Sequence, residues 1–190
     1  MNEKVIQDDE QNAQYLTFFT ADERYVIDIR DVEEIIETGQ ITRVPMMPDY
    51  IRGVMNLRGN VVPVVDLAVR FGKARSGLAG RSCIVLVDVK SQGEWRQLGL
   101  LIDDVNEILE IPASRFQPPP DFGSDVHTGF IRAMVRVDDV FAILLAVDRI
   151  LSLEELGRIG EIVRQAAPGQ PDSVVKSGEH RTGELKTESE

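Results

Sequence analysis

The chain has 190 residues, of which 43% are hydrophobic, so it can bury a sizeable core as one domain or as two small subdomains that share a core. Its net charge of −11 and pI near 4.7 argue against a nucleic-acid or anionic-membrane surface, because either would need a basic patch. No apolar run reaches the roughly 20 residues that cross a bilayer, and neither a signal peptide nor an internal disulfide is expected, which predicts a cytoplasmic protein.

The chain begins with a polar stretch and then becomes rich in β-branched and aromatic residues. Residues 1–13 are predicted to be a disordered tail, followed by a single domain over residues 14–167. Tyr15 to Thr20 and Tyr25 to Ile29 are predicted strands of a hairpin, with a polar turn between them. Asp31 to Glu37 is compatible with either a short helical turn or an irregular strand.

The stretch Tyr50 to Gly72, YIRGVMNLRGNVVPVVDLAVRFG, predicts a second hairpin. Its strands are Val54 to Leu57 and Val61 to Val65, and the pair Gly59-Asn60 is expected to supply the positive φ angles of the turn. The second strand is apolar on both faces and should be covered on both sides. Pro63 should lie at an edge or a bulge, because proline cannot donate a ladder hydrogen bond.

The following residues predict a short helical turn and two further hairpins. Leu67 to Phe71 forms the helical turn, which Gly72 ends. The strand bounds are Ser82 to Val89 with Arg96 to Ile102, joined through Ser91 to Glu94, and Phe130 to Val137 with Val140 to Val147, joined at Asp138-Asp139. Trp95 is interpreted as a turn aromatic that packs on its own strand.

A C-terminal helix is predicted after the last strand. Ser152 and Glu155 form a capping box at its start. Pro168-Gly169 ends it, and residues 168–190 are predicted to be a disordered tail. One apolar stripe should face the core, made of Leu153, Leu156, Ile159 and Val163.

An internal repeat relates the two halves of the chain. The block IRDVEEI, which starts at Ile29, recurs as IDDVNEI from Ile102, a spacing of 73 residues. Each block follows a predicted strand and precedes a proline segment and a glycine, Gly53 or Gly129, that opens a hairpin. The match predicts duplication into two units of about five strands, which would reduce open edges by curling into small barrels.

No catalytic arrangement is visible in the sequence. A nucleophile and its base must lie within hydrogen-bond reach, yet His127 lies in a polar loop and His180 in the predicted tail. Cys83 lies inside an apolar strand, where an inert thiol is expected, and the acidic pairs Asp103-Asp104 and Asp138-Asp139 are explained by turn chemistry. We therefore predict a protein-binding scaffold, not an enzyme, with no cofactor and no metal site.

The run GVMNLRGNVVPVVDL strongly resembles the chemotaxis coupling protein family, the CheW-like domain, in which G-x-x-N-L-R-G-x-x-x-P-x-x-D-L is the signature. The stretches YVIDIRDVEEI, RVPMMP and LGLLIDDV resemble the same family in the same order. The resemblance covers about Tyr15 to Leu156. It implies a mainly β fold of two five-stranded SH3-like barrels that share a core, with short helices and a C-terminal helix.

The resemblance also implies an adaptor that couples methyl-accepting chemoreceptors to the regulatory domain of a two-component histidine kinase, in arrays at the membrane. Glu34 and Arg58 match positions that the family associates with receptor and kinase coupling, and their charges are expected to pair across the first barrel. Four residues match positions that line a groove for the receptor hairpin: Ile29, Val32, Cys83 and Ile108. A surface ion pair and plain core packing are the alternatives for these two sets.

Two segments match nothing in the family pattern, the basic loop Lys73 to Arg81 and the tail beyond Pro168. An adaptor of the same fold in another kinase pathway, such as surface motility or second-messenger control, is the alternative function. Neighbouring genes for receptors and kinases would separate the two possibilities.

Overall fold

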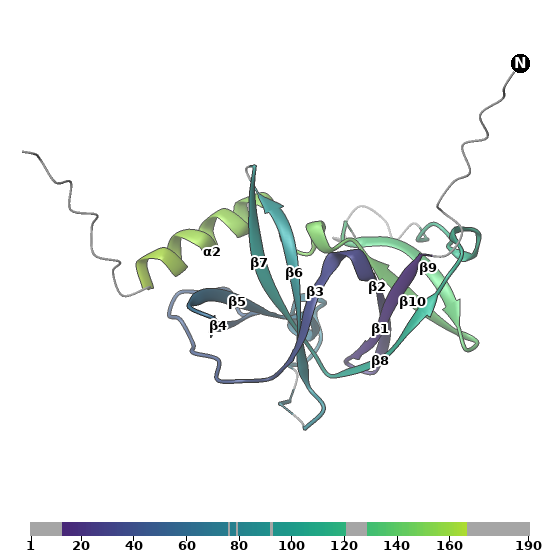
Figure 1. Ribbon diagram of the computed structural model, residues 1–190, viewed down its shortest axis with the longest axis horizontal. Helices are drawn as coiled ribbons and strands as arrows, with labels where there is room; N and C mark the ends of the chain where they lie inside the picture. The colour runs from purple at the N-terminus through teal and green to yellow at the C-terminus, as the bar shows by residue number, and fades with distance from the viewer. Residues whose placement is uncertain (1–12, 76, 79, 92, 121–128, 167–190) are drawn as a thin grey trace, which may run out of the picture.

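The computed structural model describes residues 13–75, 77–78, 80–91, 93–120 and 129–166. In these residues, ten strands form two five-stranded sheets that lie side by side (Figure 1). The strands are β1 (Gln14–Thr20), β2 (Glu23–Asp28), β3 (Val32–Glu37), β4 (Ile51–Leu57), β5 (Asn60–Asp66), β6 (Cys83–Ser91), β7 (Glu94–Ile102), β8 (Asp104–Glu110), β9 (Ile131–Val137) and β10 (Val140–Leu145). The helices are η1 (Ile29–Asp31), α1 (Leu67–Arg70), η2 (Ala113–Arg115), η3 (Val147–Arg149) and α2 (Leu153–Ala166).

The two sheets have the same topology, but they are not the two halves of the chain. The first sheet has the order β8-β1-β2-β10-β9 and the second has β3-β6-β7-β5-β4. If each strand of the first unit is taken as equivalent to the strand five positions later, β1 to β6 and so on to β5 to β10, one order becomes the other. The duplication is therefore visible in the fold, but each sheet combines strands of both units. Strands β3, β4 and β5 of the first unit share a sheet with β6 and β7 of the second, and β8, β9 and β10 share the other with β1 and β2.

Each sheet curls until its two edges are linked by one isolated bridge. After β3, Thr42 pairs with Val54 of β4, and after β8, Gln117 pairs with Met134 of β9. Both bridges have two backbone hydrogen bonds of 2.8 to 2.9 Å. No ladder closes either sheet within the described part of the chain, so each is a curled sheet and not a fully hydrogen-bonded barrel.

Gly53 is required where the second sheet curls. Its φ is +152°, and a Cβ atom there would lie 2.3 Å from the carbonyl oxygen of Thr42. Its counterpart in the repeat, Gly129, has open space around the same position. We expect Gly53→Ala to lower the free energy of unfolding by roughly 2 to 3 kcal/mol, measured by urea denaturation. Gly129→Ala is the control and should change it little; equal losses in the two variants would contradict this role of Gly53.

Alternation along the strands builds three hydrophobic clusters. Val85 and Val87 of β6 point into the core that the two sheets share, whereas Ile84 and Leu86 point into the curl of the second sheet. Val26 of β2 likewise lies inside the curl of the first sheet. Because successive side chains of a strand face opposite sides, strands between two cores must be apolar on both faces. The predicted shared core is confirmed.

One of the two predicted tight turns uses residues other than those expected. In the β4–β5 turn, the positive φ angles belong to Arg58 (52°) and Gly59 (89°), so the pair Gly59-Asn60 was a wrong assignment. The predicted turn at Asp138-Asp139 is confirmed, and both residues have positive φ. These two-residue turns match the right-handed twist of the flanking strands.

The predicted environments of Pro63, at a sheet edge or a bulge, and of Leu153, in the core-facing stripe of the helix, differ from those in the structure. Pro63 lies on β5, an interior strand, although the parallel pairing of β5 with β7 begins only at the next residue, Val64. A register shift of β4 lies nearby, opposite Val64 and Val65. On α2, Leu156 and Ile159 are buried, but Leu153 is 61% exposed and does not belong to the core stripe. The predicted end of this helix at Pro168-Gly169 lies outside the described residues.

Other local predictions hold with small shifts. The capping box is present, since the Ser152 backbone N–H donates to Glu155 at 2.7 Å and the Glu155 N–H donates to the Ser152 hydroxyl at 3.1 Å. Both alternatives for residues 31–37 occur in succession, as η1 and then β3, and Ile29 belongs to η1 and not to a strand. Strands β6 and β7 are each two residues longer at their shared turn than predicted.

Candidate functional site

The tip of the β4–β5 hairpin presents an arginine on a rigid turn. The side-chain oxygen of Asn56 accepts a hydrogen bond from the Gly59 N–H at 3.0 Å, which closes the turn from the inside. Arg58, held with a positive φ, directs its side chain outward, and that side chain is 69% exposed. The run N-L-R-G therefore holds a guanidinium group at a defined place on the surface.

The aspartate of the same motif has a structural role. Asp66 is fully buried, and one carboxylate oxygen caps α1 by accepting from the Val69 N–H at 3.3 Å. The other oxygen lies 3.3 Å from a guanidinium nitrogen of Arg52, whose side chain is 17% exposed. Asp66 therefore joins β4, β5 and α1 at the base of the hairpin.

Glu34 and Arg58 form the predicted ion pair. The Arg58 Nη2 donates to both carboxylate oxygens of Glu34, at 2.8 and 3.0 Å. Glu34 lies on β3 and Arg58 on the β4–β5 turn, at opposite edges of the second sheet, so the curl of the sheet brings them together. Their side chains are 37% and 69% exposed, and such a pair adds under about 1 kcal/mol to stability. The charges are thus open to a partner at little structural cost.

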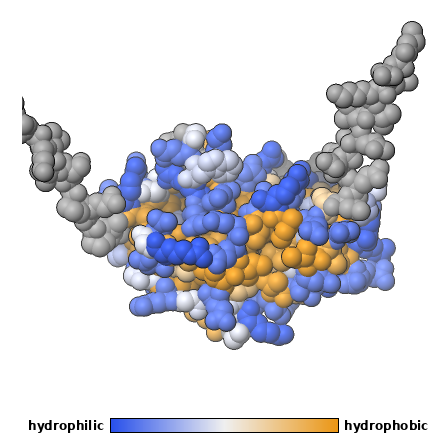
Figure 2. Space-filling model, viewed as in Figure 1, coloured by the Kyte–Doolittle hydropathy of each residue, from blue (hydrophilic) through white to orange (hydrophobic). Residues whose placement is uncertain are grey.

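The residues expected to line a groove separate into two groups. Ile29, Val32 and Cys83 are partly buried and pack against the shared core. Ile108, on β8, is 52% exposed and belongs to none of the three clusters. The same is true of its repeat counterpart Ile35, which is 40% exposed. Figure 2 shows apolar surface gathered on this face where the two sheets meet. We refer below to this apolar surface between β3 and the first sheet, with Ile29, Val32, Cys83 and Ile108, as the inter-sheet groove, after the site that the family resemblance predicts.

The comparisons with known proteins agree with this architecture. A family model for the CheW-like domain matches residues 14–155. The chain is 32% identical over 151 residues to the chemotaxis protein CheW of Klebsiella aerogenes, which covers 80% of this chain and 89% of that protein. The chain belongs to the CheW-like family. It is also 34% identical over 140 residues to the chemotaxis protein CheW of Rhizobium meliloti, covering 74% of this chain and 88% of that one.

A solved CheW structure shares the fold. The crystal structure of the scaffolding protein TtCheW from Thermoanaerobacter tengcongensis aligns with a TM-score of 0.67 and 32% sequence identity, covering 74% of this chain and 88% of that one. The matched CheW-like domain begins at β1 and ends in the first turn of α2, so it contains both sheets, the Glu34–Arg58 pair and the inter-sheet groove.

Cys83 is a packing residue of the CheW-like domain. Burial and, to a smaller extent, the nearby Asp104 carboxylate raise the pKa of its thiol to about 11, against the opposing effect of a hydrogen bond with the Val105 backbone. The thiol is therefore protonated near neutral pH, when it is a poor nucleophile. This agrees with the inert thiol predicted for a cysteine inside an apolar strand.

Other potential reactive groups of the CheW-like domain have structural partners. Asp103 accepts a hydrogen bond from the Ala21 N–H at 2.7 Å, Asp104 pairs with Arg81, and Asp138 pairs with Arg24. Within the described ranges, no group of three or more His, Cys, Asp or Glu side chains could hold a metal ion, and no helix is long and apolar enough to cross a membrane. Both histidines lie outside those ranges.

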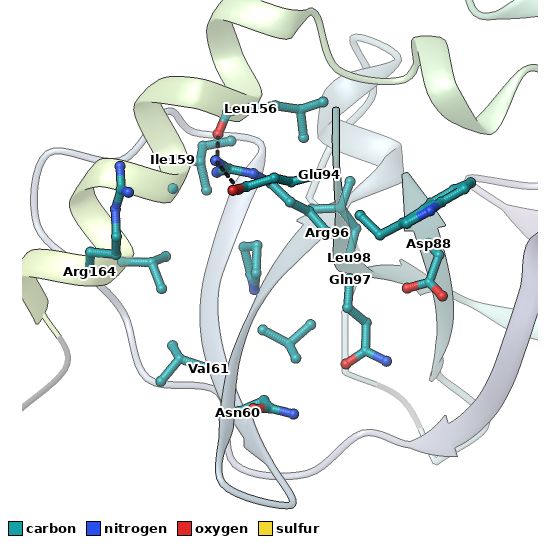
Figure 3. Close-up of a pocket in the computed structure, with 15 residues that line it drawn as sticks. Asn60, Val61, Asp88, Glu94, Arg96, Gln97, Leu98, Leu156, Ile159 and Arg164 are labelled. Atoms are coloured by element: carbon teal, nitrogen blue, oxygen red, sulfur yellow. Dashed lines mark hydrogen bonds and ion pairs between the residues drawn. The ribbon is translucent and has the colours of Figure 1, made fainter. Parts of the chain in front are cut away.

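A pocket of about 470 Å³ lies where α2 covers β5 and β7 of the CheW-like domain (Figure 3). Its buried floor is apolar and includes Leu98, Leu156 and Ile159. Arg96 reaches from β7 to the helix, where it donates to the Leu156 carbonyl at 3.4 Å, with Glu94 beside it at 3.9 Å. These contacts hold α2 against the second sheet.

Proposed function

We propose that this protein is a non-enzymatic chemotaxis adaptor that connects the cytoplasmic tip of methyl-accepting chemoreceptors to the regulatory domain of a two-component histidine kinase. The observation that carries the proposal is the match of the whole two-sheet domain to the CheW-like family. It would act in the cytoplasm, at receptor arrays on the membrane. Chemotaxis is favoured over another kinase pathway because both relatives described above are chemotaxis proteins.

The two surface features suit two different kinds of contact. The inter-sheet groove offers apolar surface from Ile29, Val32 and Ile108, which suits the apolar face of a receptor helix. The Glu34–Arg58 pair offers exposed charge at the end of the second sheet, which suits the coupling contact with the kinase. An adaptor needs both at once, and coupling is then a free energy shared between the two sites.

A bridging experiment tests the proposal. A receptor fragment that contains the helical hairpin tip is immobilised, and the kinase regulatory domain is passed over it with and without the full chain. We expect the kinase domain to be retained only when the chain is present, because the chain binds both partners. An acidic protein of similar size and unrelated fold is the control. Binding to neither partner, or to only one of them, would contradict the adaptor function.

A further inference from the structure

The distal half of the β6–β7 hairpin extends beyond its sheet as a two-stranded arm. β6 pairs with β3 only as far as Val87, and β7 pairs with β5 only over residues 99–101. Residues 88–91 and 94–98 therefore have no third strand, and the hairpin projects from the second sheet in Figure 1. We name residues 88–98 the β6–β7 arm. One face of the arm packs on the shared core and α2 through Val89, Leu98 and Arg96, which leaves its other face, with Asp88 and Trp95, without a covering element of the described chain.

Trp95, the only tryptophan of the chain, lies on the arm with 69% of its surface exposed. Across the ladder it faces Lys90, whose ammonium nitrogen is 5.9 Å from the ring centroid. The indole ring is therefore not packed on its own strand, as was expected for an aromatic residue at a turn. Tryptophan is the residue most enriched where binding energy is concentrated in protein interfaces, because its large ring is mostly apolar.

A pocket of about 560 Å³ lies beside this ring, and carboxylates outnumber cations in its lining. Asp31, Glu33 and Asp88 line it with one cation, Arg30, while Lys90 lines an adjoining pocket with Asp88 and Trp95. Loss of hydration raises the pKa of Asp88, and the Glu33 carboxylate raises it further by repulsion. Within the described residues the Asp88 side chain has no hydrogen bond or ion pair, while the Gln97 side chain donates to Glu33. The arginine of this pocket, Arg30, is already bound to Asp28 at 2.6 Å.

Val32 connects this pocket to the inter-sheet groove. It packs against the shared core as a groove residue and also lines the pocket beside Trp95. Figure 3 shows Asp88 on the side of the arm away from α2, whereas Arg96 points toward the helix. A helix lying in the groove and continuing past Val32 would therefore meet the ring and the two carboxylates.

We propose that the receptor-binding groove continues past Val32 onto the β6–β7 arm, where Trp95, Asp88 and Glu33 bind a lysine or arginine of the receptor helix. This rests on the proposed adaptor function. The alkyl part of the basic side chain lies on the indole ring, and its charge lies between the carboxylates, which combines cation–π attraction with ion pairing. The partner is an amphipathic helix with its apolar stripe in the groove and a basic residue on the same face beyond it.

The single tryptophan allows a direct test. The full chain is titrated with a receptor hairpin fragment that contains no tryptophan, and binding is followed by calorimetry and by tryptophan emission. We expect the emission to shift to shorter wavelength and to saturate with the calorimetric midpoint. Trp95→Ala and Asp88→Asn should each weaken receptor binding about 10-fold or more and leave binding of the kinase regulatory domain unchanged. Asp88→Asn should also reduce the salt dependence of receptor binding.

Glu94→Gln is the matched control, because Glu94 lies on the same arm but near Arg96 and α2. It should bind the receptor as wild type does, and circular dichroism should show all variants folded. Receptor binding by calorimetry with unchanged emission and unaffected variants would overturn the arm site and leave the adaptor function intact. An emission shift with the kinase domain alone would also overturn it. Absence of receptor binding by wild type would overturn both proposals.

Discussion

Asp66→Ala is expected to lower the free energy of unfolding by roughly 3 to 5 kcal/mol. The substitution removes a fully buried carboxylate, so the guanidinium of Arg52 loses this charge partner in a largely buried place. It also removes the acceptor for the Val69 N–H at the start of α1. Urea denaturation followed by circular dichroism measures the change. Asp66→Asn keeps an acceptor oxygen but not the charge, so its loss should be smaller.

The internal repeat supplies a control for Asp66. Asp148 follows the corresponding hairpin of the second unit in the same sequence context, Val-Asp, but it lies within η3, it is exposed, and no side chain caps that helix. Asp148→Ala should therefore change the free energy of unfolding by under about 0.5 kcal/mol. Similar losses in the Asp66 and Asp148 variants would contradict a structural role that is specific to the buried motif aspartate.

Charge reversal at the hairpin tip is expected to separate binding from stability. Arg58→Glu and Glu34→Arg should each weaken binding of the kinase regulatory domain by about 10-fold or more, because the proposed contact uses both exposed charges. The free energy of unfolding should fall by under about 1 kcal/mol, since both side chains of the pair are partly in water. Calorimetry with the kinase domain and urea denaturation measure the two quantities.

The double reversal distinguishes a direct contact from a supporting role. With both substitutions the ion pair can form again with its charges exchanged, but a partner that contacts the guanidinium at the tip would meet a carboxylate. We expect no recovery of kinase binding. Recovery in the double variant would show that the pair only holds the hairpin in place. Arg158→Ala removes an exposed arginine from α2 and should bind as wild type does.

Elements governed by local chemistry were predictable from the sequence. The hairpin at Asp138-Asp139, the helical turn at α1 and the capping box at Ser152 all follow from residues within a few positions of each other. The family signature similarly identified Glu34 and Arg58, which the structure places 2.8 Å apart. The structure confirms the ion pair between Glu34 and Arg58, whereas the role of these residues in coupling stays a prediction.

The exposure of several apolar side chains was not predictable from the sequence. Leu153 continues the apolar stripe of α2 but lies at the first residue of the helix and is exposed, and Trp95 lies on a hairpin that is longer than expected. Ile108 is an apolar residue with the same pattern as its neighbours, yet half of it is exposed. The sequence pattern of an apolar residue in a strand or helix is the same whether or not another element covers that residue.

The residues alone specified a mainly β chain, most of its strands and its duplication, because alternation and repeated blocks are properties of short segments. They did not specify β8 as a strand or the residues of the β4–β5 turn. Only the tertiary structure decided that β3, β4 and β5 share a sheet with β6 and β7, and that β8, β9 and β10 share one with β1 and β2. Strands apolar on both faces can pair with several neighbours, and burial of a shared core selects the arrangement. The same curl and arrangement bring Glu34 to Arg58 and open the inter-sheet groove, so the candidate site exists only in the folded protein.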